Sequence, residues 1–185
     1  MAIGEAMAAR WAVWTSPASA AEWDTIYAEQ LPRVYNFFRY RVGDGPVAED
    51  LTSATFEKAW RSRGRYRRDL AGFGTWLFVI ARRVAIDHYR TARRHAPLEA
   101  AAAVPGGPTP EEIAERRSDA ERLAGLLGRL SEEDRELIAL KYGAGLTNRA
   151  IARLTGIGES NVGTRLHRRI QELRARWDGK EPHDG

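Results

Sequence analysis

Arginine side chains are concentrated between residues 61 and 94 of this 185-residue sequence. The stretch has ten arginines against two acidic residues, Asp69 and Asp87, although the whole chain carries a net charge of only +4. Like charges so close together repel one another unless an anion lies among them, so the pattern indicates a surface for a polyanion such as nucleic acid. The arginines are Arg61, Arg63, Arg65, Arg67, Arg68, Arg82, Arg83, Arg90, Arg93 and Arg94.

Residues 75–94 have the periodicity of an amphipathic helix, with arginines on one face only. The apolar face comprises Leu77, Ile80, Ala81, Val84, His88 and Ala92, and the opposite face carries Arg82, Arg83, Arg90, Arg93 and Arg94. Trp76, Val79 and Ile86 fall among these arginines, where an aromatic ring can stack on an unpaired base while guanidinium groups hold phosphates. Packing against neighbouring helices is the alternative for Trp76 and for Phe73.

A second set of side chains suited to DNA lies in the helical pattern of residues 159–176. The packing stripe of this pattern consists of Val162, Leu166, Ile170 and Leu173. The outer face consists of Ser160, Asn161, Gly163, Thr164, His167, Arg168 and Gln171. Because arginine can bind guanine and glutamine can bind adenine through paired hydrogen bonds, this face is suited to the major groove. Arg165, Arg169 and Arg174 flank it and suit phosphate contacts.

Catalytic and metal-binding patterns are missing from the sequence. There is no cysteine, no carboxylate cluster and no phosphate-cradling glycine loop. Asp87 and His88 are adjacent, but neighbouring helical residues point about 100° apart, so they do not form a pair. We therefore expect a binding protein and not an enzyme, with no cofactor and no metal.

The elements that position these residues are all predicted to be helices, so the expected fold is all-α. Helical spacing covers residues 21–41, with Pro32 expected to kink or divide the helix. A second helix follows the turn Asp44-Gly45-Pro46 and runs to about Arg61, and residues 64–74 read as a basic loop before the helix of residues 75–94.

Proline, glycine and alanine dominate residues 96–108, which indicates a flexible linker between two small domains, 21–95 and 109–177. Thr109, Pro110 and Glu112 form a capping box that begins the second domain. Ser131 is expected to cap a helix ending near Gly143 to Gly145. Short helices at residues 147–154 and 159–176, separated by Thr155-Gly156-Ile157-Gly158, form a helix-turn-helix pattern.

The chain ends are expected to be disordered, as an extension at residues 1–20 and a tail at residues 178–185. Residues 11–14 are too short an apolar run for a signal peptide or a membrane span. The sequence therefore predicts a cytoplasmic protein without membrane insertion.

Three blocks of this sequence together resemble a known family. They are Ala48-Glu-Asp-Leu-Thr-Ser-Ala-Thr-Phe-Glu-Lys-Ala-Trp60, the block from Phe73 to Arg90, and the block from Leu146 to Arg169. In order and spacing they are similar to the conserved blocks of extracytoplasmic-function (ECF) sigma factors, over about residues 22–176. The resemblance implies a subunit that binds RNA polymerase core, captures the melted minus-ten element with its first domain and reads the minus-thirty-five element as duplex with its second. It also implies, by analogy, an anti-sigma partner.

The resemblance assigns residues to each of these contacts. Core polymerase would bind at Asp50, Leu51, Ser53, Phe56 and Glu57, for which a solvated face is the alternative. Single-stranded minus-ten DNA would bind at Arg65, Arg67, Arg68, Phe73, Trp76, Arg82, Arg83 and Arg90. The minus-thirty-five reading positions correspond to Gly163, Thr164, His167 and Arg168, all on the outer face found from the helical wheel.

Three departures from the family pattern stand out. Gly163 replaces a usual lysine or arginine, Ala150 replaces a usual glutamate, and Arg83 stands where asparagine is common. The first two put the familiar minus-thirty-five preference and one helix cap in doubt.

Two other classes of function remain open at the level of sequence. A conventional helix-turn-helix regulator would bind duplex DNA without polymerase. A nucleic-acid enzyme such as a nuclease would require a catalytic cluster that the sequence does not contain.

Overall fold

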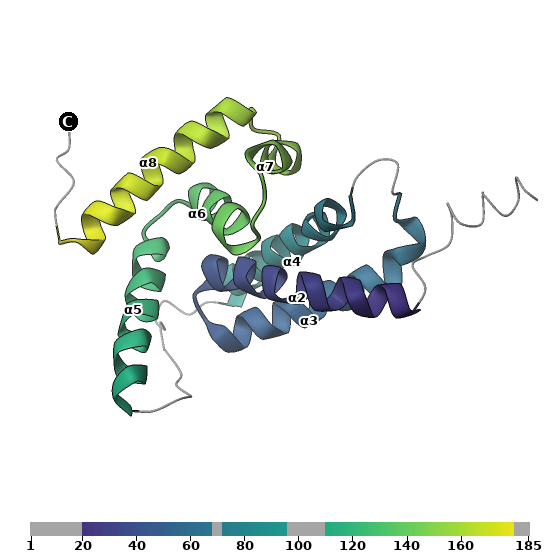
Figure 1. Ribbon diagram of the computed structural model, residues 1–185, viewed down its shortest axis with the longest axis horizontal. Helices are drawn as coiled ribbons and strands as arrows, with labels where there is room; N and C mark the ends of the chain where they lie inside the picture. The colour runs from purple at the N-terminus through teal and green to yellow at the C-terminus, as the bar shows by residue number, and fades with distance from the viewer. Residues whose placement is uncertain (1–19, 68–71, 96–109, 180–185) are drawn as a thin grey trace, which may run out of the picture.

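The computed structural model describes residues 20–67, 72–95 and 110–179, and every regular element in them is helical, as predicted (Figure 1). The first domain consists of α2 (Ala20–Val42), α3 (Gly45–Ser62), a 3-10 turn (Arg63–Arg65) and α4 (Phe73–His95). The second consists of α5 (Pro110–Gly128), α6 (Glu132–Ile138), a π-helical turn (Ala139–Gly143), α7 (Asn148–Thr155) and α8 (Glu159–Trp177). Residues 1–19, the predicted linker with Thr109, and residues 180–185 lie outside the described residues.

Side-chain caps begin α3 and α6 at residues that the sequence marks as turns or caps. Asp44 accepts a hydrogen bond from the Val47 amide (2.9 Å) at the start of α3. Ser131 accepts one from the Asp134 amide (3.2 Å) at the start of α6. Each cap satisfies an amide that the helix leaves without a partner, which contributes about 1 kcal/mol.

The predicted boundaries differ from the structure in two places. Helix α4 begins at Phe73, inside the predicted loop, because the Gly72 carbonyl accepts the Trp76 amide (3.1 Å) and starts the helix earlier. Of the kink or division expected at Pro32, the division does not occur, because Val34, Phe37 and other residues beyond the proline are buried and hold α2 in one piece.

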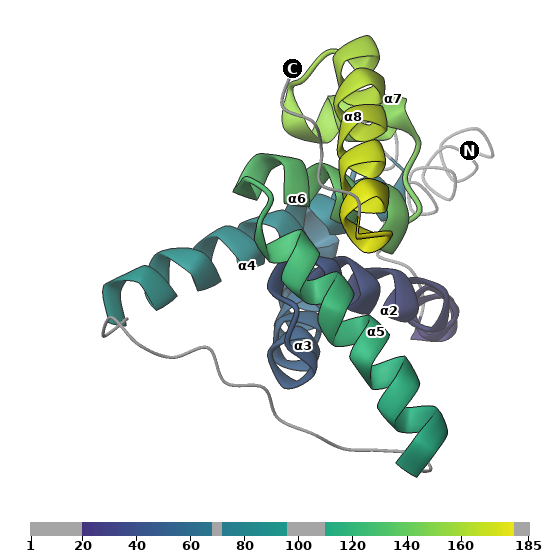
Figure 2. The same cartoon turned by 90° about the vertical axis from the view of Figure 1, so that its left-hand side faces the viewer.

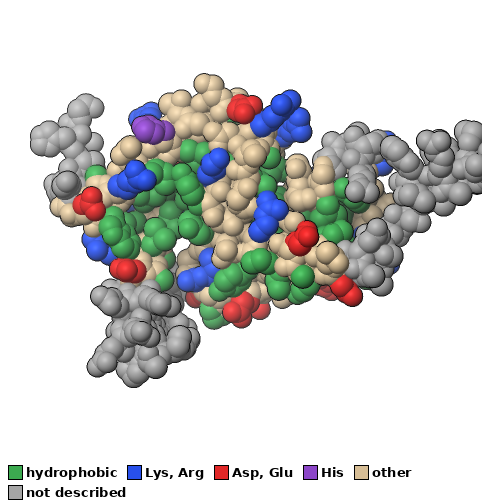
Figure 3. All heavy atoms as spheres, in the orientation of Figure 1, with side chains coloured by type: hydrophobic (Ala, Val, Ile, Leu, Met, Phe, Trp, Pro, Cys, Tyr) green, Lys and Arg blue, Asp and Glu red, His purple; other side chains and the backbone are tan. Residues whose placement is uncertain are grey.

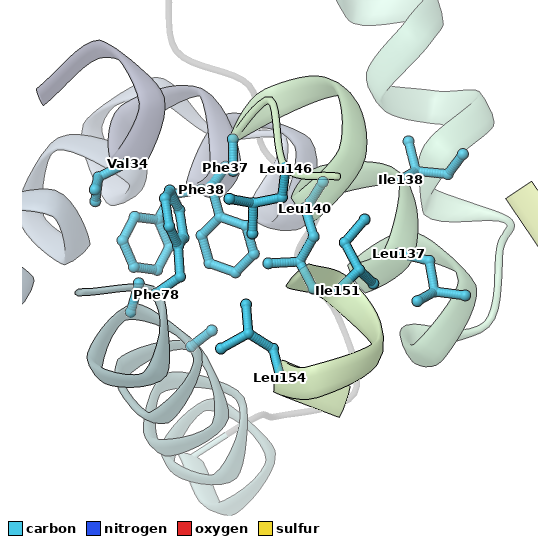
Figure 4. Close-up of a cluster of buried hydrophobic side chains, with 14 of the residues drawn as sticks. Val34, Phe37, Phe38, Phe78, Leu137, Ile138, Leu140, Leu146, Ile151 and Leu154 are labelled. Atoms are coloured by element: carbon cyan, nitrogen blue, oxygen red, sulfur yellow. The ribbon is translucent and has the colours of Figure 1, made fainter. Parts of the chain in front are cut away.

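A feature that the sequence did not predict is that the two domains pack against each other through a shared apolar core. In Figure 4, Phe37 and Phe78 of the first domain face Leu140, Ile151 and Leu154 of the second. Figures 1 and 2 show the same relation from two sides, with α6 and α7 lying against α2 and α4 while α5 and α8 project away. All five of these side chains are at most 9% exposed.

Gly143 lies at a close backbone approach within this contact. A Cβ atom at Gly143 would lie 2.8 Å from the Asn36 carbonyl oxygen and 2.9 Å from the Phe37 amide nitrogen. No side chain fits between the backbone of the π-helical turn and that of α2. Glycine therefore allows the two domains to approach at backbone-to-backbone distance.

Candidate nucleic-acid interface

Helix α8 presents the polar face that the sequence predicts. Val162, Leu166 and Leu173 are buried against the rest of the second domain. The exposed residues of the predicted reading face are Ser160, Asn161, Thr164, His167, Arg168 and Gln171, and Gly163 is half-buried beside them. The helix packs by one stripe and leaves the opposite side open along its first three turns, which is the arrangement required of a helix that enters a groove.

Helix α7 and the turn after it hold α8 in place. Thr147 caps α7 by accepting the Ala150 amide (3.2 Å), so the cap forms although the usual glutamate is replaced by Ala150. Gly156 ends α7 with φ of 76°, the left-handed conformation that a helix C-terminus favours and that glycine adopts without strain. These two local signals produce the predicted helix-turn-helix.

Two arginines of α8 have partners that the sequence analysis missed. Asp134 of α6, a buried residue, binds Arg165 at 2.7 Å and Arg169 at 2.9 Å, and Glu133 adds a second contact to Arg165 at 3.1 Å. These ion pairs fasten α8 to α6. Arg165 and Arg169 therefore hold α8 against α6 and are not the exposed phosphate-binding groups that the sequence predicts, whereas Arg174 is exposed.

The electrostatics of Asp134 are consistent with this anchoring role. Burial alone would raise the pKa of its carboxyl group, but the hydrogen bond from Arg165 and the charges of Arg165 and Arg169 outweigh burial and hold the pKa below its ordinary value. The carboxylate stays ionised at neutral pH. The sequence does indicate that Asp134 lies at a helix start, because Ser131 and Asp134 have the spacing of a capping pair. It does not indicate that Arg165 and Arg169 of α8 are its partners.

Gly163 leaves room for a neighbouring side chain on the reading face. A Cβ atom at Gly163 would lie 3.4 Å from the side-chain nitrogen of Asn148, at the start of α7. A longer side chain at position 163 would therefore contact Asn148 directly. The departure from the family's basic residue thus changes the shape of this surface as well as its charge.

Helix α4 carries the second candidate surface. Arg83 and Arg90 are exposed, and Val79 and Ile86 alternate with them along the same stripe with 36% and 52% of their surface accessible. Guanidinium groups interleaved with apolar side chains can hold phosphates and contact bases at once, as binding of a single strand requires.

The first turn of α4 belongs to a cluster of aromatic side chains in the first domain. Phe73 and Trp76 stand one turn apart with ring centroids 5.3 Å apart, and Tyr66 lies 5.4 Å from Phe73 and 5.2 Å from Trp76. Phe73 and Trp76 are both half-buried, so packing occupies part of each ring and leaves part accessible. Arg65 and Arg67 are exposed beside the cluster, and Arg68 lies outside the described residues.

The cluster extends to two further tryptophans that the sequence analysis did not assign to a site. Trp23 packs edge-to-face on Phe73 (5.7 Å) and on Trp60 (5.1 Å). Trp60 is 39% exposed and has the Arg63 guanidinium 3.8 Å above its ring. The sequence does not show that these tryptophans belong to the cluster, because α2, α3 and α4 bring them together only in the folded domain.

Arg82 does not lie on the exposed face that the helical wheel assigned to it. Its Nε and Nη2 atoms each donate to a carboxylate oxygen of Glu136 at 2.9 Å, and its Nη1 donates to the Leu154 carbonyl oxygen. Both partners belong to the second domain. The domain contact therefore separates Arg82 from Arg83 and Arg90.

The residues of α3 that the sequence predicts to bind polymerase core fall into an exposed group and a buried group. Asp50, Ser53 and Glu57 are exposed and form one stripe, whereas Leu51 and Phe56 are buried in the core of the first domain. On the face shown in Figure 3, acidic side chains lie along the lower edge and also at the left and the top, and Lys and Arg side chains are scattered over the whole face. At the end of the stripe, Glu57 pairs with Arg61 of the same helix at 2.6 Å.

A metal-binding cluster and a membrane-spanning helix are both absent from the described part of the chain. Within residues 20–67, 72–95 and 110–179, no His, Asp and Glu side chains gather in a way that could hold a metal ion. In that same part of the chain, no helix is both long enough and apolar enough to cross a bilayer.

Comparisons with known proteins identify a family for each domain. Residues 26–95 match the family Sigma-70 region 2, and residues 120–173 match Sigma-70 region 4. The structure resembles the sigma factor RpoE in its complex with the anti-sigma factor NepR from Bartonella quintana, with a TM-score of 0.67 at 22% identity over 84% of this chain and 96% of that one.

Curated relatives give the same family. The chain is 30% identical to the ECF RNA polymerase sigma factor SigL of Mycobacterium tuberculosis over 85% of its own length and 89% of the relative. It is 31% identical to the ECF sigma factor BldN of Streptomyces coelicolor over 80% of its own length, but it spans only 57% of that relative. The alternative of a regulator that acts without polymerase is not favoured by these matches. With its region 2 and region 4 matches and these relatives, the chain belongs to the ECF RNA polymerase sigma factors.

Proposed function

We propose that this sigma factor reads a minus-thirty-five element as duplex DNA with the exposed face of α8. The observation that supports the proposal best is the separation of the two faces of α8, with an apolar stripe buried and six polar residues of the predicted reading face exposed. Arg168 and Gln171 are the members of that face able to make paired hydrogen bonds to purines. The apolar anchors and the Asp134 ion pairs keep the face presented to the groove.

The first domain, in this proposal, captures the melted minus-ten strand. Arg83 and Arg90 would hold phosphates along α4, with Arg65 and Arg67 near the other end. Phe73 and Trp76 supply partly open rings on which an unstacked base can lie. Sigma factors are non-catalytic in this scheme, because binding alone selects the start site.

Core polymerase would dock on the acidic stripe of α3, which consists of Asp50, Ser53 and Glu57. Reversal of its charges tests this contact. Reversing Asp50 or Glu57 to lysine should weaken assembly with core about tenfold or more, because like charges then face each other in the interface. The matched control is Glu49→Lys, an exposed position on the same helix outside the stripe. Sedimentation or fluorescence titration with core measures the affinity, and circular dichroism checks folding. Normal assembly of both stripe variants would remove α3 from the proposal.

The decisive experiment for the whole function is transcription in vitro. Core polymerase with the purified chain should select start sites from a randomised promoter library, and the selected sequences should contain two separate elements. Core alone provides the baseline. If the chain directs no start-site selection, or if it binds duplex promoter equally well without core, the proposal is wrong.

An anti-sigma partner and a cytoplasmic location complete the proposal. RpoE in the similar solved structure is bound by the anti-sigma factor NepR, and we extend that relation to this chain by analogy. The cytoplasm follows because core polymerase and chromosomal DNA are found there.

A further inference from the structure

Asn148, the first residue of α7, carries a side-chain oxygen that has no partner in the described part of the chain. Its Oδ1 atom is shielded from solvent, and no N–H or O–H group of the described residues donates to it. Buried carboxamide oxygens in folded proteins nearly always accept a hydrogen bond, because the water that is lost on burial must be replaced by another donor. A donor from outside the described residues is therefore required to satisfy Oδ1.

This side chain lies against the reading face of α8. Its Nδ2 atom is 3.4 Å from the position that a Cβ atom would take at Gly163. Gly163 has Ser160 one turn before it and His167 one turn after it, and both are exposed members of that face. Figures 1 and 2 show α7 beside the first turns of α8. Because Gly163 has no side chain, the Asn148 carboxamide borders the middle of the reading face and not its edge.

The chemistry of the Asn148 carboxamide selects among the groups of DNA that could approach it. Its Oδ1 atom accepts hydrogen bonds and its Nδ2 atom donates them. A phosphate supplies only acceptors, so it could bind Nδ2 but would leave Oδ1 without a donor. Adenine alone of the four bases supplies both in the major groove, with N7 as an acceptor and the N6 amino group as a donor. Rotation of the carboxamide about its soft Cβ–Cγ bond turns both atoms toward the groove.

We propose that Asn148 is a specificity-determining residue of the minus-thirty-five contact, and that it reads an adenine through the space left by the missing side chain at position 163. The proposal rests on the function proposed above, in which α8 enters the major groove. Asn148 adds to that function a base contact made from α7, the helix that otherwise supports α8. Asn148 and Gly163 act as a unit, because a side chain at position 163 would cover the carboxamide.

Selection from a library with a randomised minus-thirty-five element, transcribed by core polymerase with the full chain, tests the assignment. The native chain should prefer adenine at one position, and Asn148→Ala should reduce that preference about fivefold or more, because a bidentate contact is lost. Asn148→Asp keeps the shape of the side chain but can only accept hydrogen bonds. It should therefore move the preference at that position to cytosine, whose N4 amino group donates, and leave the other positions unchanged.

A neighbouring residue separates this role from a general effect on α7. Arg149→Ala changes the next residue of the helix, which is exposed, and should leave the base preference unchanged. Asn148→Asp guards against loss of folding, because a carboxylate is favourable in the first turn of a helix. If Asn148→Ala weakens all promoters equally, Asn148 holds a phosphate and the proposal is wrong. Loss of the adenine preference in Arg149→Ala would also overturn it, because any change in the first turn of α7 would then suffice.

Position 163 provides a second test, because Gly163→Ala keeps α8 helical and puts a methyl group against Nδ2 of Asn148. It should weaken the adenine preference of the native chain and have no further effect in Asn148→Ala, since the two residues are coupled. Equal effects in both backgrounds would overturn the proposal. A minus-thirty-five preference that depends on Arg168 but not on Asn148 would also overturn it and leave the proposed function in place. Failure of the native chain to select any minus-thirty-five sequence would instead reject the proposed function.

Discussion

Single residues decide what each proposed DNA-binding surface can recognise, and Arg168 is the clearest case. It is exposed on α8, next to the exposed His167 and on the side of the helix opposite the buried Leu166. Its neighbours Arg165 and Arg169 are committed to Asp134, so their charge serves to hold the helix. In the proposed function, base recognition on this part of α8 therefore falls to Arg168.

Replacement of Arg168 should change sequence preference and not only affinity. Arg168→Ala should cost about 1–3 kcal/mol at one minus-thirty-five position if its contact to a base is bidentate. Arg174→Ala, an exposed arginine on the same helix, should instead weaken all promoters nearly equally. Promoter selection from a randomised library measures both. An unchanged base preference for Arg168→Ala would reject its assignment as a reading residue.

Asp134 should make stability depend on pH in the acid range. Because its folded-state pKa lies below the unfolded value, its contribution is present above the unfolded pKa of about 4 and is lost as pH falls through the folded pKa. Asp134→Asn should lower the free energy of unfolding by about 2 kcal/mol at pH 7 and flatten its dependence on pH below about 4. Urea unfolding at several pH values measures both effects. Equal slopes for native and variant chains would show that Asp134 does not carry this dependence.

At the scale of elements, short local signals determine where the helices of the second domain begin and end. The Thr147 hydroxyl, the left-handed Gly156 and the Ser131 hydroxyl each act within one turn of chain. The helix-turn-helix could therefore be predicted from sequence with nearly correct boundaries. Helix α4 shows the limit, since it begins at Phe73, inside the predicted loop, and its first turn lies in an aromatic cluster with Tyr66 and Trp23 that forms only in the folded domain.

The cap of α7 can be tested without touching the reading face. Thr147→Ala should lower the free energy of unfolding by about 1 kcal/mol, because the Ala150 amide loses its partner. Thr147→Ser retains the hydroxyl group and should stay close to the native value. Thermal unfolding followed by circular dichroism compares the three proteins. Equal losses in both variants would assign the effect to the threonine methyl group and not to the cap.

At the scale of the whole molecule, the shared core makes the domains depend on each other. Ile151 belongs to α7 but is fully buried, in a cluster that includes Phe37 and Phe78 of the first domain. A cavity at position 151 should lower the stability of both domains, because buried side chains pack continuously across the domain contact.

Ile151→Ala should therefore destabilise the first domain as well as the second. We expect a loss of about 2–4 kcal/mol in the free energy of unfolding. Hydrogen exchange at amides of α3 and of α8 measures the two domains separately, and protection should fall in both. If protection falls only in α8, the domains are energetically independent in solution and the shared core does not couple them.

The sequence by itself determined the helices, the helix-turn-helix, the basic face of α4, the reading face of α8 and the acidic stripe of α3. These follow from local periodicity, capping residues and charge, all of which act over a few turns of chain. Only the tertiary structure decided that Arg82 bonds Glu136, that Asp134 holds Arg165 and Arg169, and that Trp23 and Trp60 join the aromatic cluster. These partners are far apart in the chain, and packing of apolar faces, which is not directional and leaves no local pattern, brings them together.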